Sequence, residues 1–279
     1  MPSPLGWPDH LLFVVLAVVF PVRAAFFGLR PLQRASESDL PRVKLAVYRR
    51  AIALQWTAVA LVALLWLLTH RSWSSLGLVP RLGGGLLGVV VGLAIMVAVL
   101  LRQGALAPGD DAALERVRQR SQGLDSDLTV ERYRQASAAL ERVRQRTRHL
   151  ERMLPTTLRE RSWFFALAGT AGVCEEVLYR GYLIWYLVAW AWLFAPHQSF
   201  LVAAVASSLL FGVGHAYQGA RGILLTLAVG GFLAAIYWIT RSLFAGMLIH
   251  ALMDLHAGYL SHLAYSRTPG HPDTGPEGA

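Results

Sequence analysis

The C-terminal half of this chain carries so little charge that its few charged residues are the first candidates for chemistry. From Trp163 to Ser266 only six positions are acidic or basic: Glu175, Glu176, Arg180, Arg221, Arg241 and Asp254. A charge in the middle of a membrane costs about 2.5–3.5 kcal/mol, so it requires an internal partner and usually marks function. Arg221 and Arg241 lie at the ends of expected spans, where an arginine can reach the interface. The other four are candidate site residues.

The spacing of three of these candidates predicts one ion pair and one free carboxylate. Glu176 and Arg180 are four residues apart in "EEVLYR". On a helix they share a face and can form an ion pair. Glu175 is turned by about 100° from its neighbour, so it needs a partner on another helix.

Two histidines further along the chain can supply that partner. His215 closes "FGVGH", and His250 opens "HALMD", in which Asp254 follows one helical turn later. We therefore expect Glu175, His215 and His250 to converge from three helices on one water molecule. A carboxylate held among apolar helices can take a proton from that water, which is general-base catalysis.

The same residue types leave a metal site open as an alternative. Glu175, His215 and His250 would form a set of two histidines and one carboxylate, the composition found at catalytic zinc. The sequence contains no HExxH motif to support a metal, so we favour the activated water and expect no cofactor. Cys174 is the only cysteine, and a small core residue is the commoner role for a lone thiol.

Counting along the helices raises a difficulty for this convergence. His215 lies about 16 residues into its expected span and His250 about 7, and the two spans run in the same direction. At 1.5 Å per residue their depths differ by roughly 13 Å. Helix tilt, or unwinding of "HAYQG" near Gly219, must close this gap.

The elements that hold these residues are predicted to be membrane helices. The 279 residues are 55% hydrophobic and only 15% charged, which is typical of a polytopic membrane protein. A membrane helix needs about 20 mostly apolar residues. The stretches that qualify are His10–Gly28, Ala51–Leu68, Gly83–Leu101, Trp163–Phe194, Ser199–His215, Gly222–Ile239 and Leu243–Ala264. A helix over the fourth of these, Trp163–Phe194, would extend about 48 Å, so it must tilt or break. Gly181 is the expected break, and the fold class is therefore an all-α bundle of seven or eight transmembrane helices.

The chain divides into four expected regions. Residues 1–102 form an N-terminal region of three spans, 103–162 an arginine-rich extramembrane segment, 163–264 the catalytic membrane region and 265–279 a disordered tail. The arginine-rich segment contains "LERVRQR" twice and predicts an amphipathic helix outside the membrane. The net charge of +9 could indicate nucleic acid or anionic lipid, and in a multi-span protein we expect lipid and no nucleic acid.

Three motifs together resemble those of one family. "EEVLYR", "FGVGH" and "HALMD" are similar to EExxxR, FxxxH and Hxxx(N/D) of the CPBP intramembrane proteases, which include type II CAAX prenyl endopeptidases and bacterial bacteriocin-processing and immunity proteins. The resemblance covers roughly residues 160–262. It implies that Glu175 and His215 activate water, and that His250 and Asp254 stabilise the oxyanion. It also implies a multi-pass protein, and "HAYQG" resembles bacterial members, so we expect the cytoplasmic membrane of a bacterium.

One position departs from what an oxyanion site requires. Asp254 accepts hydrogen bonds when ionised but donates none, so it must either orient His250 or be protonated.

The expected function is an intramembrane endopeptidase acting on a membrane-associated protein or peptide, which can be lipidated. A CAAX-like tail, a leader peptide and a sorting tag are equally compatible substrates. Two other classes remain open: a non-catalytic membrane scaffold or immunity factor, and a proton-coupled transporter that uses intramembrane carboxylates.

Overall fold

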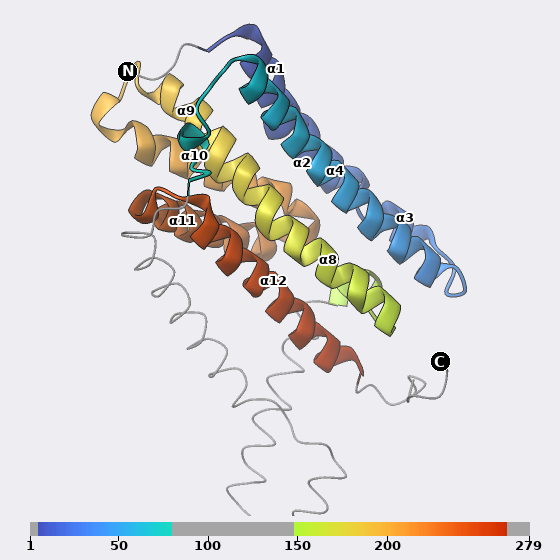
Figure 1. Cartoon of the computed structure of the whole chain (residues 1–279). Coiled ribbons are helices and arrows are strands. Elements are labelled where there is room, and N and C mark those ends of the chain that lie inside the picture. The colour runs from blue at the N-terminus through green and yellow to red at the C-terminus, as the bar shows by residue number, and fades with distance from the viewer. Residues whose placement is uncertain (1–4, 80–147, 267–279) are drawn as a thin grey trace, which may run out of the picture.

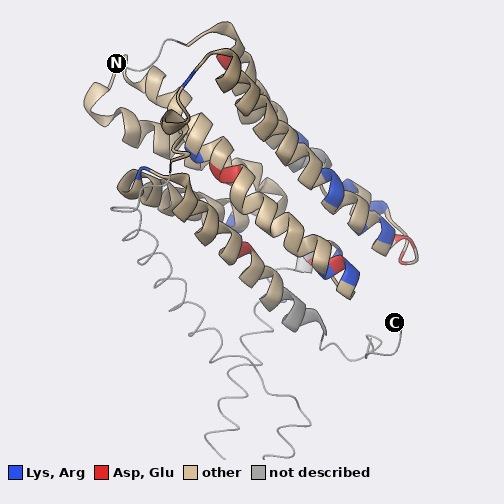
Figure 2. Cartoon of the chain, viewed as in Figure 1, with Lys and Arg blue, Asp and Glu red and all other residues tan. Residues whose placement is uncertain are grey.

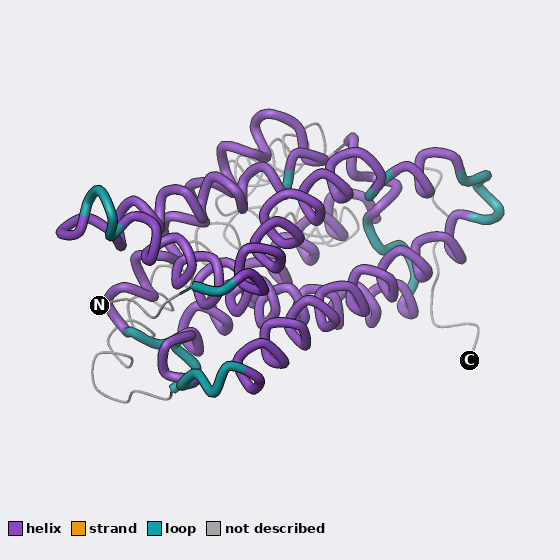
Figure 3. The backbone as a smooth tube through the Cα atoms, turned by 90° about the horizontal axis from the view of Figure 1, so that it is seen from above, coloured by secondary structure: helices purple, strands orange, loops and turns teal. Residues whose placement is uncertain are grey.

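A computed structural model describes residues 5–79 and 148–266 of the chain. These residues are mostly helical, and the two described ranges contain no strand (Figures 1 and 3). The predicted all-α class is thus confirmed for this part of the chain. The expected span Gly83–Leu101, most of the arginine-rich segment 103–162 and nearly all of the tail 265–279 lie outside the described residues.

The first described range contains two long helical runs. One is formed by α1 (Trp7–Val14), the π-helix η1 (Val15–Val19) and α2 (Phe20–Phe27), which follow one another directly. After the short α3 (Arg30–Arg34), α4 extends over Leu40–Leu68 and ends before the 3-10 turn η2 (Trp73–Leu76). Helix α4 begins well before the expected Ala51, and its first turns carry Lys44 and Tyr48, whose side chains are buried within the protein.

The second range begins with a single helical run that contains a change of helix type. The 3-10 turn η3 (Arg148–Met153) leads to α8 (Leu158–Glu175), the π-helix η4 (Glu176–Leu183) and α9 (Ile184–Ala191). The side chain of Thr157 accepts a hydrogen bond from the backbone of Glu160 and caps α8. The run is about 50 Å long, as the sequence suggests.

The expected break at Gly181 is wrong. The backbone continues through Gly181 as a π-helix without interruption. This glycine instead allows a close approach, since a Cβ atom there would lie 3.2 Å from the carbonyl oxygen of Leu76.

The remaining helices complete the bundle. The turn η5 (Pro196–Gln198) precedes α10 (Ser199–Gly214), the turn η6 (Ala216–Gln218) precedes α11 (Gly219–Thr240), and α12 spans Leu243–Ser266. Helix α8 packs between α4 and α12, and α10 packs against α9 and α11 (Figure 1).

Three helical segments of the described residues are long and apolar enough to cross a membrane: Leu40–Leu68, Pro196–Gly214 and Ala216–Thr240. The expected number of seven or eight spans stays a prediction.

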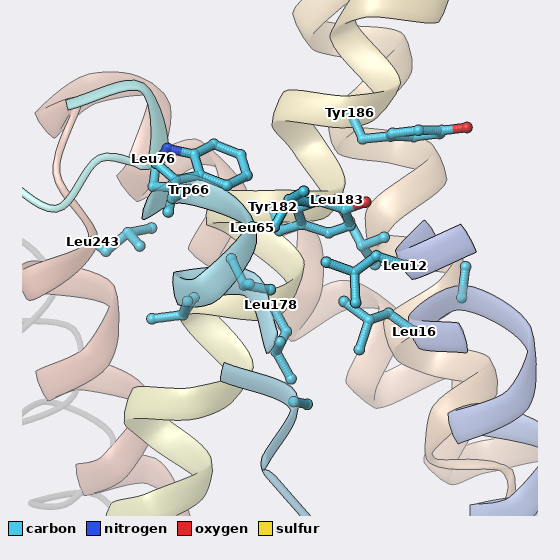
Figure 4. Close-up of a cluster of buried hydrophobic side chains, with 14 of the residues drawn as sticks. Leu12, Leu16, Leu65, Trp66, Leu76, Leu178, Tyr182, Leu183, Tyr186 and Leu243 are labelled. Atoms are coloured by element: carbon cyan, nitrogen blue, oxygen red, sulfur yellow. The ribbon is translucent and has the colours of Figure 1, made fainter. Parts of the chain in front are cut away.

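One large apolar cluster joins the N-terminal helices to the helix that carries the "EEVLYR" motif (Figure 4). Leu12 and Leu16 come from the first helical run, Leu65 and Trp66 from α4, and Tyr182 from η4. The Tyr182 hydroxyl also donates to the backbone oxygen of Asp9 at 2.6 Å. The N-terminal helices therefore form part of the same core as η4.

Candidate active site

The two adjacent glutamates lie where the α-helix α8 changes into the π-helix η4. Glu175 is the last residue of α8 and Glu176 the first of η4. Figure 2 shows acidic residues in the middle of this long helical run and on α12, whereas basic residues gather near the ends of the helices. The widened π-helical turns follow immediately after the two carboxylates, as is frequent at functional sites.

Glu176 is fully enclosed and takes part in a buried charge network. Its Oε1 accepts from Arg180 at 2.8 Å, which confirms the pair expected from their spacing. Arg180 also donates to the backbone oxygen of Gly230 on α11, at 3.2 Å. The same Oε1 atom lies 2.9 Å from Nδ1 of His250. Since a carboxylate only accepts, His250 carries a proton on Nδ1.

Glu175 presents one satisfied and one unsatisfied oxygen. Its Oε1 accepts from the side-chain amide of Gln55 on α4, at 3.1 Å. Its Oε2 is buried and has no hydrogen-bond partner among the described residues. That atom lies 4.0 Å from Nε2 of His215 and 3.8 Å from Nε2 of His250. The structure therefore brings the acid and both imidazoles together, as their types and spacing predict.

The orientation of His215 follows from its own helix. Its Nδ1 lies 2.8 Å from the backbone oxygen of Phe211 and must donate to it. In the neutral ring, the lone pair is then on Nε2, the atom that faces Glu175. The Phe211 ring packs against both His215 and His250, with centroid distances of 4.6 and 5.8 Å, and fixes their relative positions.

Asp254 lies at the open side of this cluster. Its Oδ2 is 3.7 Å from Nε2 of His250, and its side chain is 41% exposed, against 15% for Glu175 and 17% for His215. Asp254 is thus placed where it can influence the outer nitrogen of His250, and the site is accessible from its side.

The depth difference predicted for His215 and His250 does not keep them apart. Helix α10 ends at Gly214, and "HAYQG" leaves α-helical geometry in η6, with Gly219 at φ 78°. This is the unwinding that the sequence suggested. A count along parallel, straight helices overestimates the separation of side chains that approach from tilted helices.

No group of three or more His, Cys, Asp or Glu side chains in the two described ranges is arranged to hold a metal ion. Two ligand atoms that each lie about 2.1 Å from one tetrahedral ion are about 3.4 Å from each other. The distances from Glu175 Oε2 to the two histidine Nε2 atoms are longer, at 3.8 and 4.0 Å.

Cys174 is completely buried, as expected of a core residue.

Gln55 is the site residue that sequence reasoning missed. It lies 120 positions before Glu175, in a stretch whose apolar composition predicts a membrane helix and no site residue. The available signal was its polar side chain within "AIALQWTAVALVALLWLL", where Thr57 is the only other clearly polar side chain apart from the ring nitrogens of two tryptophans.

The comparisons with known proteins bear on the region that contains the three motifs. Residues 158–256 match the model of the family described as "Type II CAAX prenyl endopeptidase Rce1-like". No curated protein and no solved structure matches the chain. The matched segment contains Glu175, Glu176, Arg180, His215, His250 and Asp254, and it leaves Gln55 outside. The match confirms, over this segment, the resemblance to the CPBP intramembrane proteases that the three motifs indicate.

Proposed function

We propose that this chain is an intramembrane endopeptidase that hydrolyses a peptide bond by water activated between Glu175 and His215. The observation that carries the proposal is the unpartnered Oε2 of Glu175, which faces the Nε2 atoms of two histidines at 3.8 and 4.0 Å. A water molecule forms hydrogen bonds at about 2.8 Å, so one molecule can bridge Oε2 to either imidazole.

In the proposed reaction, Glu175 Oε2 takes one proton of the water while the water oxygen attacks the carbonyl carbon of the substrate. His215 Nε2 accepts a hydrogen bond from the other proton and orients the water. The C=O bond becomes a C–O⁻ single bond in a tetrahedral intermediate. When the C–N bond breaks, the proton held by Glu175 passes to the leaving nitrogen, and the products are a carboxylic acid and an amine.

His250 is proposed to stabilise the oxyanion. Glu176 holds its Nδ1–H at 2.9 Å, and Asp254 lies 3.7 Å from its Nε2. When the ring is protonated on both nitrogens, its Nε2–H donates to the developing negative charge while Glu176 holds the Nδ1–H. This role suits Asp254 as an aspartate, because it supports the donor and does not have to donate itself.

The proposed substrate is a peptide or protein at the membrane, and the proposed location is a bacterial cytoplasmic membrane. The family match supports a CAAX-like tail, while a leader peptide or a sorting tag has the same scissile chemistry. Exposed apolar side chains on α4, α10 and α11 support a bilayer environment.

The test is the replacement Glu175→Gln, which keeps the shape and removes the base. Purified wild-type and variant proteins in liposomes are given a farnesylated CAAX peptide and a leader peptide, and product release is measured by mass spectrometry. We expect wild-type cleavage of one of them and a loss of at least about 100-fold in Glu175→Gln. Equal cleavage by both proteins would refute the proposal. Uptake coupled to a proton gradient, without cleavage, would instead identify a transporter.

A further inference from the structure

The N-terminal helix α4 reaches the candidate site through a single polar side chain. Gln55 lies on α4, outside the segment that matches the endopeptidase family. Its Nε2 donates to Glu175 Oε1 at 3.1 Å. Every other contact described above for Glu175 comes from helices within the matched segment. Gln55 is therefore a contribution of the N-terminal region to the site.

The hydrogen bonding of Gln55 is unfavourable for stability alone. Its Oε1 is buried and has no hydrogen-bond partner among the described residues. An unsatisfied buried polar atom costs about 1–3 kcal/mol, and a hydrogen bond to a charged group contributes about as much, so Gln55 adds little net stability. A leucine at this position would avoid that cost. The polar side chain is better explained by what it does to Glu175.

The bond constrains the carboxylate in the way the proposed reaction requires. With Oε1 held by Gln55, rotation of the carboxylate is restricted and Oε2 is directed at the two imidazoles. The bond survives the proton transfer, because Oε1 accepts from the amide whether Oε2 is ionised or protonated.

We propose that Gln55 is a positioning residue that orients Glu175 for proton transfer, so that the active site is completed by a helix outside the segment that matches the family. The proposal rests on the proposed function in that Glu175 acts as the base. It assigns to the N-terminal region a part in the reaction itself.

The experiment compares Gln55→Met with Thr57→Val, in the full chain and in liposomes. Methionine keeps the length of the side chain and removes the amide. Thr57 is exposed on the same helix, and its hydroxyl donates to Ala53 within α4 at 2.8 Å, so Thr57→Val is a matched control. For Gln55→Met we expect kcat to fall about 10-fold, corresponding to about 1.4 kcal/mol, with KM unchanged and a melting temperature no lower than that of wild type. Thr57→Val should keep wild-type kcat.

A second measurement does not depend on substrate. Dicyclohexylcarbodiimide reacts with protonated carboxyl groups, and peptide mapping separates the adduct on Glu175 from that on Glu176. We expect Glu175 to be labelled about threefold faster in Gln55→Met than in wild type or Thr57→Val, because the Oε1 atom that Gln55 holds becomes free to react. Gln55→Leu provides a second variant if the methionine protein does not fold.

The possible outcomes distinguish this proposal from the proposed function. If Glu175→Gln abolishes cleavage while Gln55→Met retains wild-type kcat and labelling, the positioning role is refuted and the proposed function stands. If Glu175→Gln still cleaves, the proposed function itself is refuted. A fall in melting temperature that accounts for the whole loss of activity would show Gln55 to be merely structural.

Discussion

The two adjacent glutamates have different surroundings, and these suit different roles. Glu176 is paired with Arg180 and His250 through Oε1, and its Oε2 is buried without a hydrogen-bond partner among the described residues. Glu175 also has one oxygen held, by Gln55, and one without a partner. The two differ in what the free oxygen faces and in access: Oε2 of Glu175 lies 4.0 and 3.8 Å from the imidazoles of His215 and His250, and its side chain is 15% exposed, against 1% for Glu176. The environment therefore favours Glu175 as the base.

Arg180 offers a test of the buried network. Arg180→Met should lower the free energy of unfolding by about 3–5 kcal/mol, because it leaves the carboxylate of Glu176 buried without its cationic partner. Unfolding in detergent by urea measures the change. The double variant Arg180→Met/Glu176→Gln removes both charges and should recover part of the loss.

The exposed Arg221 is the matched control for this prediction. Arg221→Gln should change the free energy of unfolding by less than about 0.5 kcal/mol, as is usual at exposed positions. If the double variant is no more stable than Arg180→Met, the lost contact of Arg180 with the Phe211 ring, at 4.6 Å, outweighs the uncompensated charge.

At the scale of elements, the site depends on how closely α8 approaches α12. Gly172 lies on α8 one turn before Glu176, and a Cβ atom there would lie 2.6 Å from the backbone nitrogen of Ala251, beside His250. Such a contact cannot be relieved by moving a side chain. The missing side chain of Gly172 thus sets the spacing that allows His250 to reach both glutamates.

Gly172→Ala should therefore push α8 and α12 apart and reduce cleavage at least about 10-fold, with a stability loss of about 1–3 kcal/mol. Gly169→Ala is the control on the same helix, since nothing lies within 4 Å of its added Cβ. That variant should keep full activity and lose no stability, because alanine favours the helix. Equal activity of the two variants would mean that the helix spacing is not limiting.

The sequence was informative where the relation between residues is local. The pairing of Glu176 with Arg180 follows from a four-residue spacing on one helix, and the three motifs each identify a candidate side chain. The path of the chain between them was harder. The helix remains continuous at Gly181, which lies in its π-helical part. The change to π-helical geometry lies in the backbone hydrogen bonds, for which the sequence has no clear pattern, so it was not predicted.

Long-range contacts explain what the sequence did not reveal. Gln55 meets Glu175 across 120 positions, and only the packing of α4 on α8 brings them together. Hydropathy identifies each as part of an apolar stretch but does not give the rotation of one helix against the other. The convergence of Glu175, His215 and His250 could be predicted from the sequence, whereas the contact of Gln55 with this group could not.

At the scale of the whole molecule, the N-terminal helices and the endopeptidase-like segment form a single structure. Lys44 on α4 pairs with Glu160 on α8 at 3.3 Å, and both side chains are almost fully buried, at 3% and 1% exposed. The backbone and hydroxyl of Thr156 also donate to Glu160 Oε2, at 2.7 and 3.1 Å. This junction fixes the start of α8 on α4, on the same two helices that bring Gln55 to Glu175.

Breaking this junction should therefore affect activity from a distance. Lys44→Met leaves Glu160 buried without its cation and should cost about 3–5 kcal/mol of unfolding free energy. Since α4 and α8 then separate more easily, kcat should fall together with the fraction of folded protein, and unfolding and cleavage should be measured on the same samples.

The exposed pair Arg152–Glu37 joins the same two parts of the chain, with side chains 37% and 84% exposed. Its disruption by Glu37→Gln should change stability by less than about 1 kcal/mol. If Lys44→Met is as stable and active as Glu37→Gln, the two parts of the chain are held by their other contacts, and the junction has no share in presenting Gln55 to the site.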